Sequence, residues 1–199
     1  MLNAVDGTIR ALCPNTFESL CYIYAVIGAN VMSITLNRNY RPVAGIAVID
    51  AGGGKHLEFL DDSSLERGLG GSYHCWIESV EVSANQIELV DFTFGNNPNY
   101  AEANGIPWKT KKVDYLWGRA KDINLGGNIT ELPKKFPEGK VWFRETKGAH
   151  EWLAMHLQEH VNDYAKMTFL ALRKYNQQLE EFRNKKSNFR NRLKGITAT

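Results

Sequence analysis

Three side chains in this 199-residue sequence have the chemistry for nucleophilic catalysis: the thiol of Cys21, the imidazole of His74 and the carboxylate of Asp91. A thiolate is a strong nucleophile, an imidazole can take the thiol proton, and a carboxylate can orient that imidazole. Taken singly, each residue also has a purely structural interpretation, because a cysteine in an apolar run is commonly a core residue. A site is therefore predicted only if the elements that carry these residues bring them together.

The segment that carries Cys21 is predicted to be a buried helix. Residues 17–36 form an apolar run that is too long for a strand. Small residues such as Ala25 and Gly28 would let another element approach this helix closely. Cys21 is expected at or within one turn of the helix N-terminus, with residues 17–20 as a lead-in. Unpaired N–H groups and the helix dipole lower the pKa of a thiol in that position.

His74 and Asp91 fall on two segments that alternate apolar and polar side chains. Residues 73–78 and 86–92 each fit a strand, and the turn-prone residues 83–85 lie between them. The spacing accommodates two strands of about six to eight residues and a turn, so both side chains return to the same edge of the sheet. A helix that begins at this edge would complete a nucleophile, base and orienter arrangement.

The other elements predict an α+β fold. Residues 3–12 suit a short amphipathic helix that ends before Pro14. The segment 95–139 is predicted to be largely loop, and 61–71 a loop rich in charge and glycine. Further strands are predicted at 43–49, which the glycines 52–54 close, and at 57–60, 113–117 and 141–143.

The C-terminal part of the chain differs from the rest. From residue 148 a continuous helical pattern leads into residues 172–196, which carry eight Lys or Arg against two Glu, within an overall net charge of +2. We interpret 1–147 as the core that carries the chemistry and 148–199 as a basic helix that packs on it or extends from it, in a single domain. A solvated or self-associating helix, and with it a homo-oligomer, is favoured over nucleic-acid binding.

Composition argues against several classes of protein. The sequence has no run of ~18 apolar residues and no signal-peptide pattern at its start, so we expect a cytoplasmic protein without a membrane partner. Cys13, Cys21 and Cys75 are odd in number and have no CxxC spacing, which predicts free thiols. Cys13 and Cys75 are assigned to packing, with Cys75 on the opposite face of the strand from His74.

One pattern invites a metal interpretation. His156, Glu159 and His160 match H-x-x-E-H, an inverted zinc-protease motif. A third ligand would be expected well downstream, where Glu180 and Glu181 are the available carboxylates. Histidines on the surface of an amphipathic helix are the favoured interpretation, and neither a metal nor another cofactor is expected.

Three short motifs resemble, in order, those of transglutaminase-like proteins of the papain-like superfamily. Residues 21–25 (CYIYA) are similar to the Cys-aromatic-aliphatic-aromatic-Ala start of the active-site helix. Residues 74–78 (HCWIE) are similar to the His-x-Trp-x-Glu strand, and 90–93 (VDFT) to the x-Asp-x-Thr strand. The length resembles that of small microbial members. The resemblance, which covers residues 17–94, implies a papain-like α+β core: an antiparallel sheet packed on a central Cys-bearing helix, with a long C-terminal helix in addition.

The resemblance also implies a catalytic triad of Cys21, His74 and Asp91 in a thiol hydrolase or acyltransferase. The substrate would be a small-molecule or peptide amide or thioester, and water or an amine would resolve the acyl-thioester.

Three further residues are given roles. Asn15, six residues before Cys21, is a candidate oxyanion donor because papain-like peptidases have a Gln at that offset. Trp76 and Thr93 are expected to support the site. The alternative function is a non-enzymatic interaction protein that retains the fold and oligomerises or binds a partner through the C-terminal helix.

Overall fold

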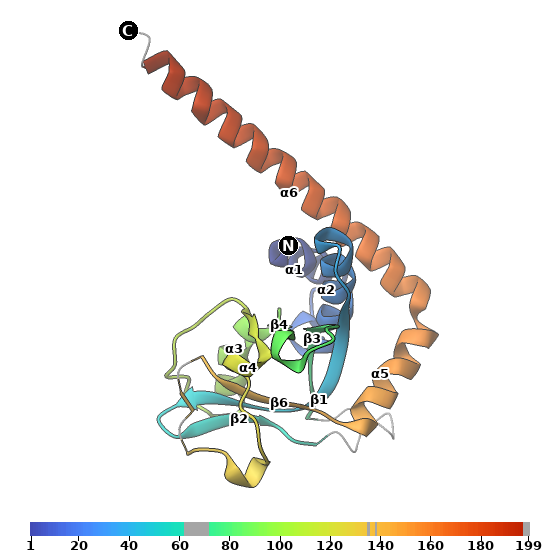
Figure 1. The fold of residues 1–199 in the computed structure, drawn as a ribbon, viewed down its shortest axis with the longest axis vertical. Helices are drawn as coiled ribbons and strands as arrows, with labels where there is room; N and C mark the ends of the chain where they lie inside the picture. The colour runs from blue at the N-terminus through green and yellow to red at the C-terminus, as the bar shows by residue number, and fades with distance from the viewer. Residues whose placement is uncertain (62–71, 135, 138, 197–199) are drawn as a thin grey trace.

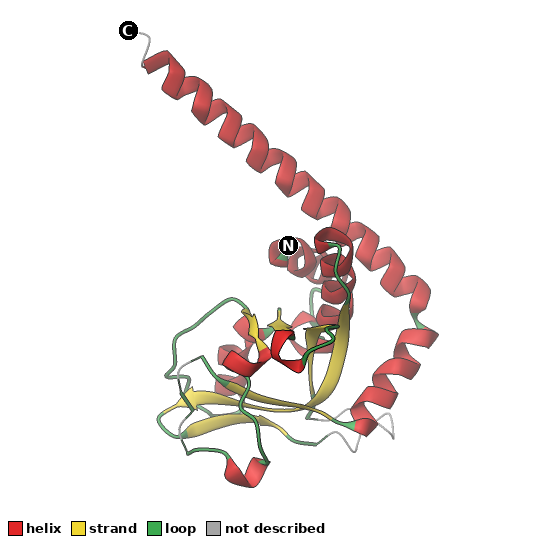
Figure 2. Ribbon diagram, in the orientation of Figure 1, coloured by secondary structure: helices red, strands yellow, loops and turns green. Residues whose placement is uncertain are grey.

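The computed structural model describes residues 1–61, 72–134, 136–137 and 139–196 as an α+β fold with a curled antiparallel sheet (Figures 1 and 2). The helices are α1 (Leu2–Leu12), α2 (Cys21–Leu36), α3 (Asn97–Ala103), α4 (Ala120–Ile123), α5 (Lys147–Glu159) and α6 (Val161–Ile196). The strands are β1 (Tyr40–Gly52), β2 (Lys55–Phe59), β3 (His74–Ser79), β4 (Glu88–Asp91), β5 (Leu116–Arg119) and β6 (Val141–Glu145).

The sheet is built around the long strand β1. Its strand order is β2-β1-β3-β4-β5, and β6 also pairs with β1. The first half of β1 pairs with β3, and the second half pairs with β6 and β2, all antiparallel. Gly45 lies where the partner changes, because it is paired with both His74 and Glu145. The position of this glycine therefore fixes the start of β3, which carries His74.

Side chains that alternate along the strands divide the core into two layers. On one face, Ala44, Cys75 and Ile77 pack with the buried side chains of α2. On the other face, Val43, Trp76 and Phe143 belong to a second apolar cluster. α2 is apolar almost all round, as expected for a helix enclosed on every side, and α1 and α6 cover it away from the sheet.

Most predicted elements are confirmed, with small shifts at their ends. The expected helix over 3–12 is α1, the expected hairpin of 73–78 with 86–92 is β3 and β4, and the glycines 52–54 form the turn between β1 and β2. The strand expected at 113–117 begins later, at Leu116. The loop predicted for 61–71 lies, beyond Asp61, outside the described residues.

Two predictions differ from the structure. Much of the segment 95–139 is loop, as expected, but it also contains the short helices α3 and α4, which were not predicted. The continuous C-terminal helix is interrupted at His160, whose φ of −114° and ψ of 23° end α5 before α6 begins. A one-residue break leaves the apolar spacing on both sides nearly unchanged, so periodicity alone does not detect it.

The two C-terminal helices differ in their contacts. α5 packs against β1, and the first part of α6 packs against α1 and α2. The rest of α6 extends well away from the sheet, as Figure 1 shows. The C-terminal segment therefore both covers the core and projects from it.

None of the described helices combines the length and apolar character needed to cross a membrane.

Replacing Gly45 by alanine tests the central position of β1. A Cβ atom there would overlap the carbonyl oxygen of Arg144 in β6, whereas one at Gly126 would meet nothing within 4 Å. We expect Gly45→Ala to lower the free energy of unfolding by about 2–3 kcal/mol in urea titrations, because backbone must move. The control Gly126→Ala should stay within about 0.5 kcal/mol of wild type. Equal stability of the two variants would contradict the packing described.

Candidate active site

Cys21 is the first residue of α2, as the sequence predicted. A short 3₁₀ turn, Phe17–Ser19, leads into it, and Leu20 has non-helical backbone angles of φ −99° and ψ 41°. Among the described residues, no side chain caps this end of the helix. The first N–H groups of α2 therefore lack the intrahelical acceptors that later N–H groups have, and they favour negative charge nearby.

His74 and Asp91 form a buried pair on neighbouring strands. Nε2 of His74 lies 2.8 Å from Oδ2 of Asp91, and their side chains are only 4% and 1% exposed. The second carboxylate oxygen, Oδ1, accepts hydrogen bonds from the backbone N–H and the hydroxyl of Thr93, at 2.8 and 2.7 Å. Asp91 is therefore held on both oxygens, and the expected support by Thr93 is a direct contact.

Cys21 and His74 meet in one cavity of about 110 Å³. Its wall also includes Phe59, Tyr73, Thr93, Asn97 and Tyr100, with Glu18 and Ser19 from the lead-in to α2. Because Asp91 engages Nε2 of His74, Nδ1 is the ring nitrogen left to face the thiol, and His74 lowers the pKa of Cys21. The three residues singled out in the sequence thus converge at the start of β3.

The electrostatic environment favours charge separation between the thiol and the imidazole. Hydrogen bonding from the Cys75 thiol, together with the hydrogen bond and charge of His74, lowers the pKa of Cys21 to about 5 although burial opposes this. Burial also disfavours the imidazolium, but Asp91 and the Cys21 thiolate raise the pKa of His74 to about 10. Between these values Cys21 is a thiolate and His74 an imidazolium.

The buried thiol of Cys75 lies next to Cys21 in the core. Its side chain lies on the α2 face of β3, opposite the aromatic side chains around His74, as strand alternation predicted. Burial and the neighbouring Cys21 thiolate raise the pKa of Cys75 well above its usual value. It therefore stays protonated beside Cys21, within the apolar cluster to which packing had assigned it. All three cysteines are free thiols.

Aromatic rings fix the plane of the His74 imidazole. Phe59 stacks on it with a centroid distance of 5.2 Å, Phe143 lies at 5.1 Å and Trp76 at 6.5 Å. Rings on several sides leave the imidazole few alternative rotamers. Trp76 is fully buried and thus supports the site from inside the core, as expected from the sequence.

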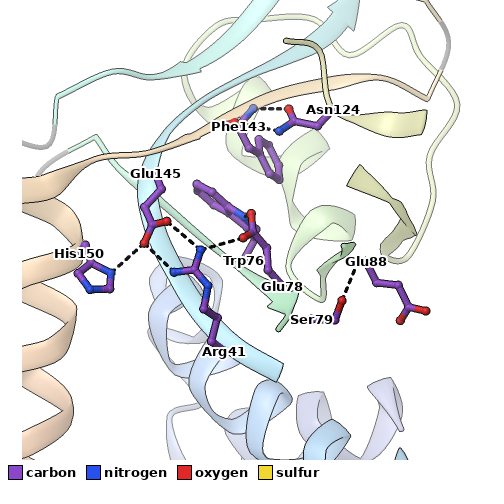
Figure 3. Close-up of polar contacts among 9 residues, drawn as sticks. All are labelled: Arg41, Trp76, Glu78, Ser79, Glu88, Asn124, Phe143, Glu145 and His150. Carbon is purple, nitrogen blue, oxygen red and sulfur yellow. Dashed lines mark hydrogen bonds and ion pairs between the residues drawn. The ribbon is translucent and has the colours of Figure 1, made fainter. Parts of the chain in front are cut away.

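A polar network in turn holds Trp76 and the strands beneath it. Its indole N–H donates to Glu78 at 2.9 Å, and Arg41 of β1 bridges Glu78 and Glu145 of β6. Figure 3 shows Arg41 between the two carboxylates, with His150 of α5 on the far side of Glu145. The network ties β1, β3, β6 and α5 together at the level of the site.

Asn15, the residue expected to stabilise an oxyanion, lies apart from this group. It occupies an exposed turn between α1 and the lead-in to α2, and it is not among the described residues that line the cavity. Asn97, at the start of α3, does line the cavity and is buried. It was missed because it falls in a segment predicted as loop, where no periodicity or spacing marks a single asparagine.

A separate group has the composition of a metal site. Ligating atoms of His156, Glu159 and His160 all lie within 4.8 Å of one another at the end of α5. The His156 ring stacks on Trp152 at 5.1 Å, while Glu159 and His160 are exposed. These residues could hold a divalent cation, but the two histidines line a different cavity, of about 310 Å³, from the one that contains Cys21.

These elements define the protein as an α+β protein with a buried His–Asp pair beside a cysteine at a helix N-terminus. No family model and no curated protein matches the chain. The crystal structure of a genomics target is similar to it, with a TM-score of 0.58 and 17% sequence identity over 86% of this chain and 75% of that one. At this identity the likeness shows the fold alone.

The lowered pKa of Cys21 predicts an unusual pH dependence of alkylation. Because the thiolate is the reactive form, iodoacetamide should modify Cys21 at a nearly constant rate at neutral pH, and the rate should fall only as the pH approaches about 5. A free thiol such as glutathione, with a pKa of ~8.5, should lose reactivity as the pH falls below that value and react slowly at neutral pH. Peptide mass mapping locates the adduct.

The variant His74→Ala removes the imidazolium and should move the inflection of the Cys21 rate to higher pH. An inflection for wild-type Cys21 at the pH of the free thiol would show that the environment does not stabilise the thiolate.

Proposed function

We propose that this protein is a cysteine-dependent hydrolase or acyltransferase with a papain-like, transglutaminase-like core, and that Cys21, His74 and Asp91 are its catalytic triad. The observation that carries the proposal is the 2.8 Å contact between Asp91 and His74, where His74 shares a cavity with Cys21. Packing alone would account for each of the three residues separately. It does not account for a carboxylate hydrogen-bonded to an imidazole that shares a cavity with a thiol at an uncapped helix N-terminus.

The geometry supports acyl transfer in two steps. The Cys21 thiolate attacks the carbonyl carbon of an amide or thioester, a C–S bond forms, and the carbonyl π electrons move to oxygen. When this intermediate collapses, the leaving amine or thiol takes the proton from Nδ1 of His74. In the second step His74 takes a proton from water or an amine, which attacks the acyl-thioester and releases Cys21 as thiolate.

Asp91 and the helix have separate roles in these steps. Asp91 holds Nε2 of His74 protonated, so Nδ1 stays directed at Cys21, and it stabilises the imidazolium. The Cys21 backbone N–H, at the start of α2, is one donor to the oxyanion. No cofactor enters the proposal.

The cavity favours a narrow acyl group. Its volume of about 110 Å³ is below the ~300–1,000 Å³ of pockets that enclose drug-sized ligands. Aromatic side chains of Phe59, Tyr73 and Tyr100 form much of its wall. We therefore propose small-molecule or peptide acyl substrates whose reactive carbonyl enters alone. The free thiols fit a reducing compartment, which for this proposal is the cytoplasm.

A second candidate is a non-enzymatic protein that uses α6 for self-association or partner binding. Two exposed aromatic side chains of α6 favour this candidate, because exposed apolar surface often marks an interaction site. Phe169 is 65% exposed, and Phe182, in the part of α6 that extends from the core, is 64% exposed. This candidate needs no acylation of Cys21, so the experiment below separates the two.

The triad predicts an acyl-enzyme on Cys21. Wild-type protein treated with p-nitrophenyl acetate and with acyl thioesters of graded size should release a burst of leaving group and gain the acyl mass on Cys21. Cys21→Ala should abolish the burst, and Asp91→Asn should slow it by about 10²–10⁴-fold, because the histidine tautomer is no longer fixed. Cys13→Ala is the matched control and should behave as wild type. An acyl group found only on Cys13, or on no cysteine, would leave the interaction protein as the better account.

A further inference from the structure

Asn97 carries an unpaired hydrogen-bond donor and lies in the wall of the Cys21 cavity. The residue is 4% exposed and lies in the cavity wall with Cys21 and His74. Its side-chain Nδ2 is buried and has no hydrogen-bond partner among the described residues. An amide of this kind loses its bonds to water on folding and gains nothing in return, which is unfavourable unless a ligand supplies the acceptor.

The position of this donor distinguishes it from the other unpaired nitrogens of the described chain. Nε2 of His56 and Nε1 of Trp108 are also buried without partners, but neither residue belongs to the wall of the Cys21 cavity. Asn97 thus combines an unsatisfied donor with a place in the wall of the cavity that contains the nucleophile. This combination indicates a ligand with a hydrogen-bond acceptor close to Cys21.

The chain between Asp91 and Asn97 holds the amide in place. Thr93 donates two hydrogen bonds back to Asp91, and the backbone N–H of Asn96 donates to the Thr93 carbonyl at 2.8 Å. Pro98, which is also buried, follows Asn97 in the first turn of α3, where its fixed φ suits the start of a helix. The hydrogen bonds that orient the carboxylate therefore also set the start of α3, and a donor fixed in advance costs little reorganisation when a charge develops.

We propose, on the basis of the acyl-transfer function above, that Asn97 is a catalytic residue that stabilises the oxyanion through Nδ2. As the C–S bond to Cys21 forms, the carbonyl π pair moves to oxygen, and that oxygen accepts hydrogen bonds from Nδ2 and from the Cys21 backbone N–H. Asn97 transfers no proton. A neutral amide also leaves the charges of the thiolate and imidazolium undisturbed, which a lysine or arginine in this place would not. Asn97 takes the role that the sequence had suggested for Asn15.

The test compares two reactions of the same thiolate. Acylation by p-nitrophenyl acetate passes through an oxyanion, whereas alkylation by iodoacetamide is a displacement at a saturated carbon and forms none. We expect Asn97→Leu to slow acylation of Cys21 by about 10²-fold and to leave its alkylation rate unchanged. Asn99→Leu, on the exposed part of the same helix, is the matched control and should retain both rates.

A measurement of stability and a second variant separate a loss of catalysis from a loss of folding. Because Nδ2 has no partner to lose, the urea midpoint of Asn97→Leu should be no lower than that of wild type. Asn97→Ala, which is smaller, should show the same selective loss of acylation. Equal losses of acylation and alkylation, a change in KM with kcat retained, or no change in either rate would overturn the role of Asn97.

The proposed function can fail separately. If wild-type Cys21 forms no acyl-enzyme, acyl transfer and the oxyanion role of Asn97 are both overturned. If the wild type is acylated and the Asn97 variants are acylated equally fast, only the role of Asn97 is overturned.

Discussion

The hydrogen bond between His74 and Asp91 is the interaction on which the rest of the site depends. A carboxylate that is 1% exposed must be matched by donors, and here the imidazole satisfies one oxygen while Thr93 satisfies the other. This requirement fixes the pairing of β3 with β4 and the turn that follows Asp91. It also positions Cys21's cavity, because the same turn leads directly into α3. Loss of either partner would leave a buried charge without compensation, which typically costs ~3–5 kcal/mol.

Cys21 adds a third group to the His74–Asp91 pair, and its thiolate places a negative charge at the N-terminus of α2. Cys75, the imidazolium and the free N–H groups of α2 all stabilise negative charge on Cys21, against the effect of burial. The aromatic rings around His74 exclude water and hold the imidazole in one plane. The Arg41 network, which Figure 3 shows, joins the strands beneath them. The packed core thus rigidly supports the charged side chains of Cys21, His74 and Asp91. Asn97, with its unpaired Nδ2, lies in the wall of the cavity next to them.

Sequence patterns located the charged group because its determinants are local. The apolar run after Leu20 and the alternation of residues 73–78 and 86–92 placed Cys21, His74 and Asp91 on the correct elements. The spacing of the two strands was enough to make the histidine and aspartate neighbours. Other features arise from contacts between distant segments. Phe59 and Tyr100 reach the cavity from elements that no pattern relates to Cys21, Asn97 lies in a segment without periodicity, and the break at His160 depends on how α5 and α6 pack on different parts of the core.

The most direct test of the central claim is an NMR pH titration of the His74 ring in wild type and in Cys21→Ala. The pKa of His74 is raised to about 10, so its imidazolium should persist from low pH through neutrality and be lost only near that value. Removal of the thiolate should move this transition to lower pH, because one of the two negative charges that stabilise the imidazolium is gone. A His74 that loses its proton at the ordinary histidine pKa of ~6.5 and does not respond to Cys21→Ala would contradict a coupled thiolate, imidazolium and carboxylate.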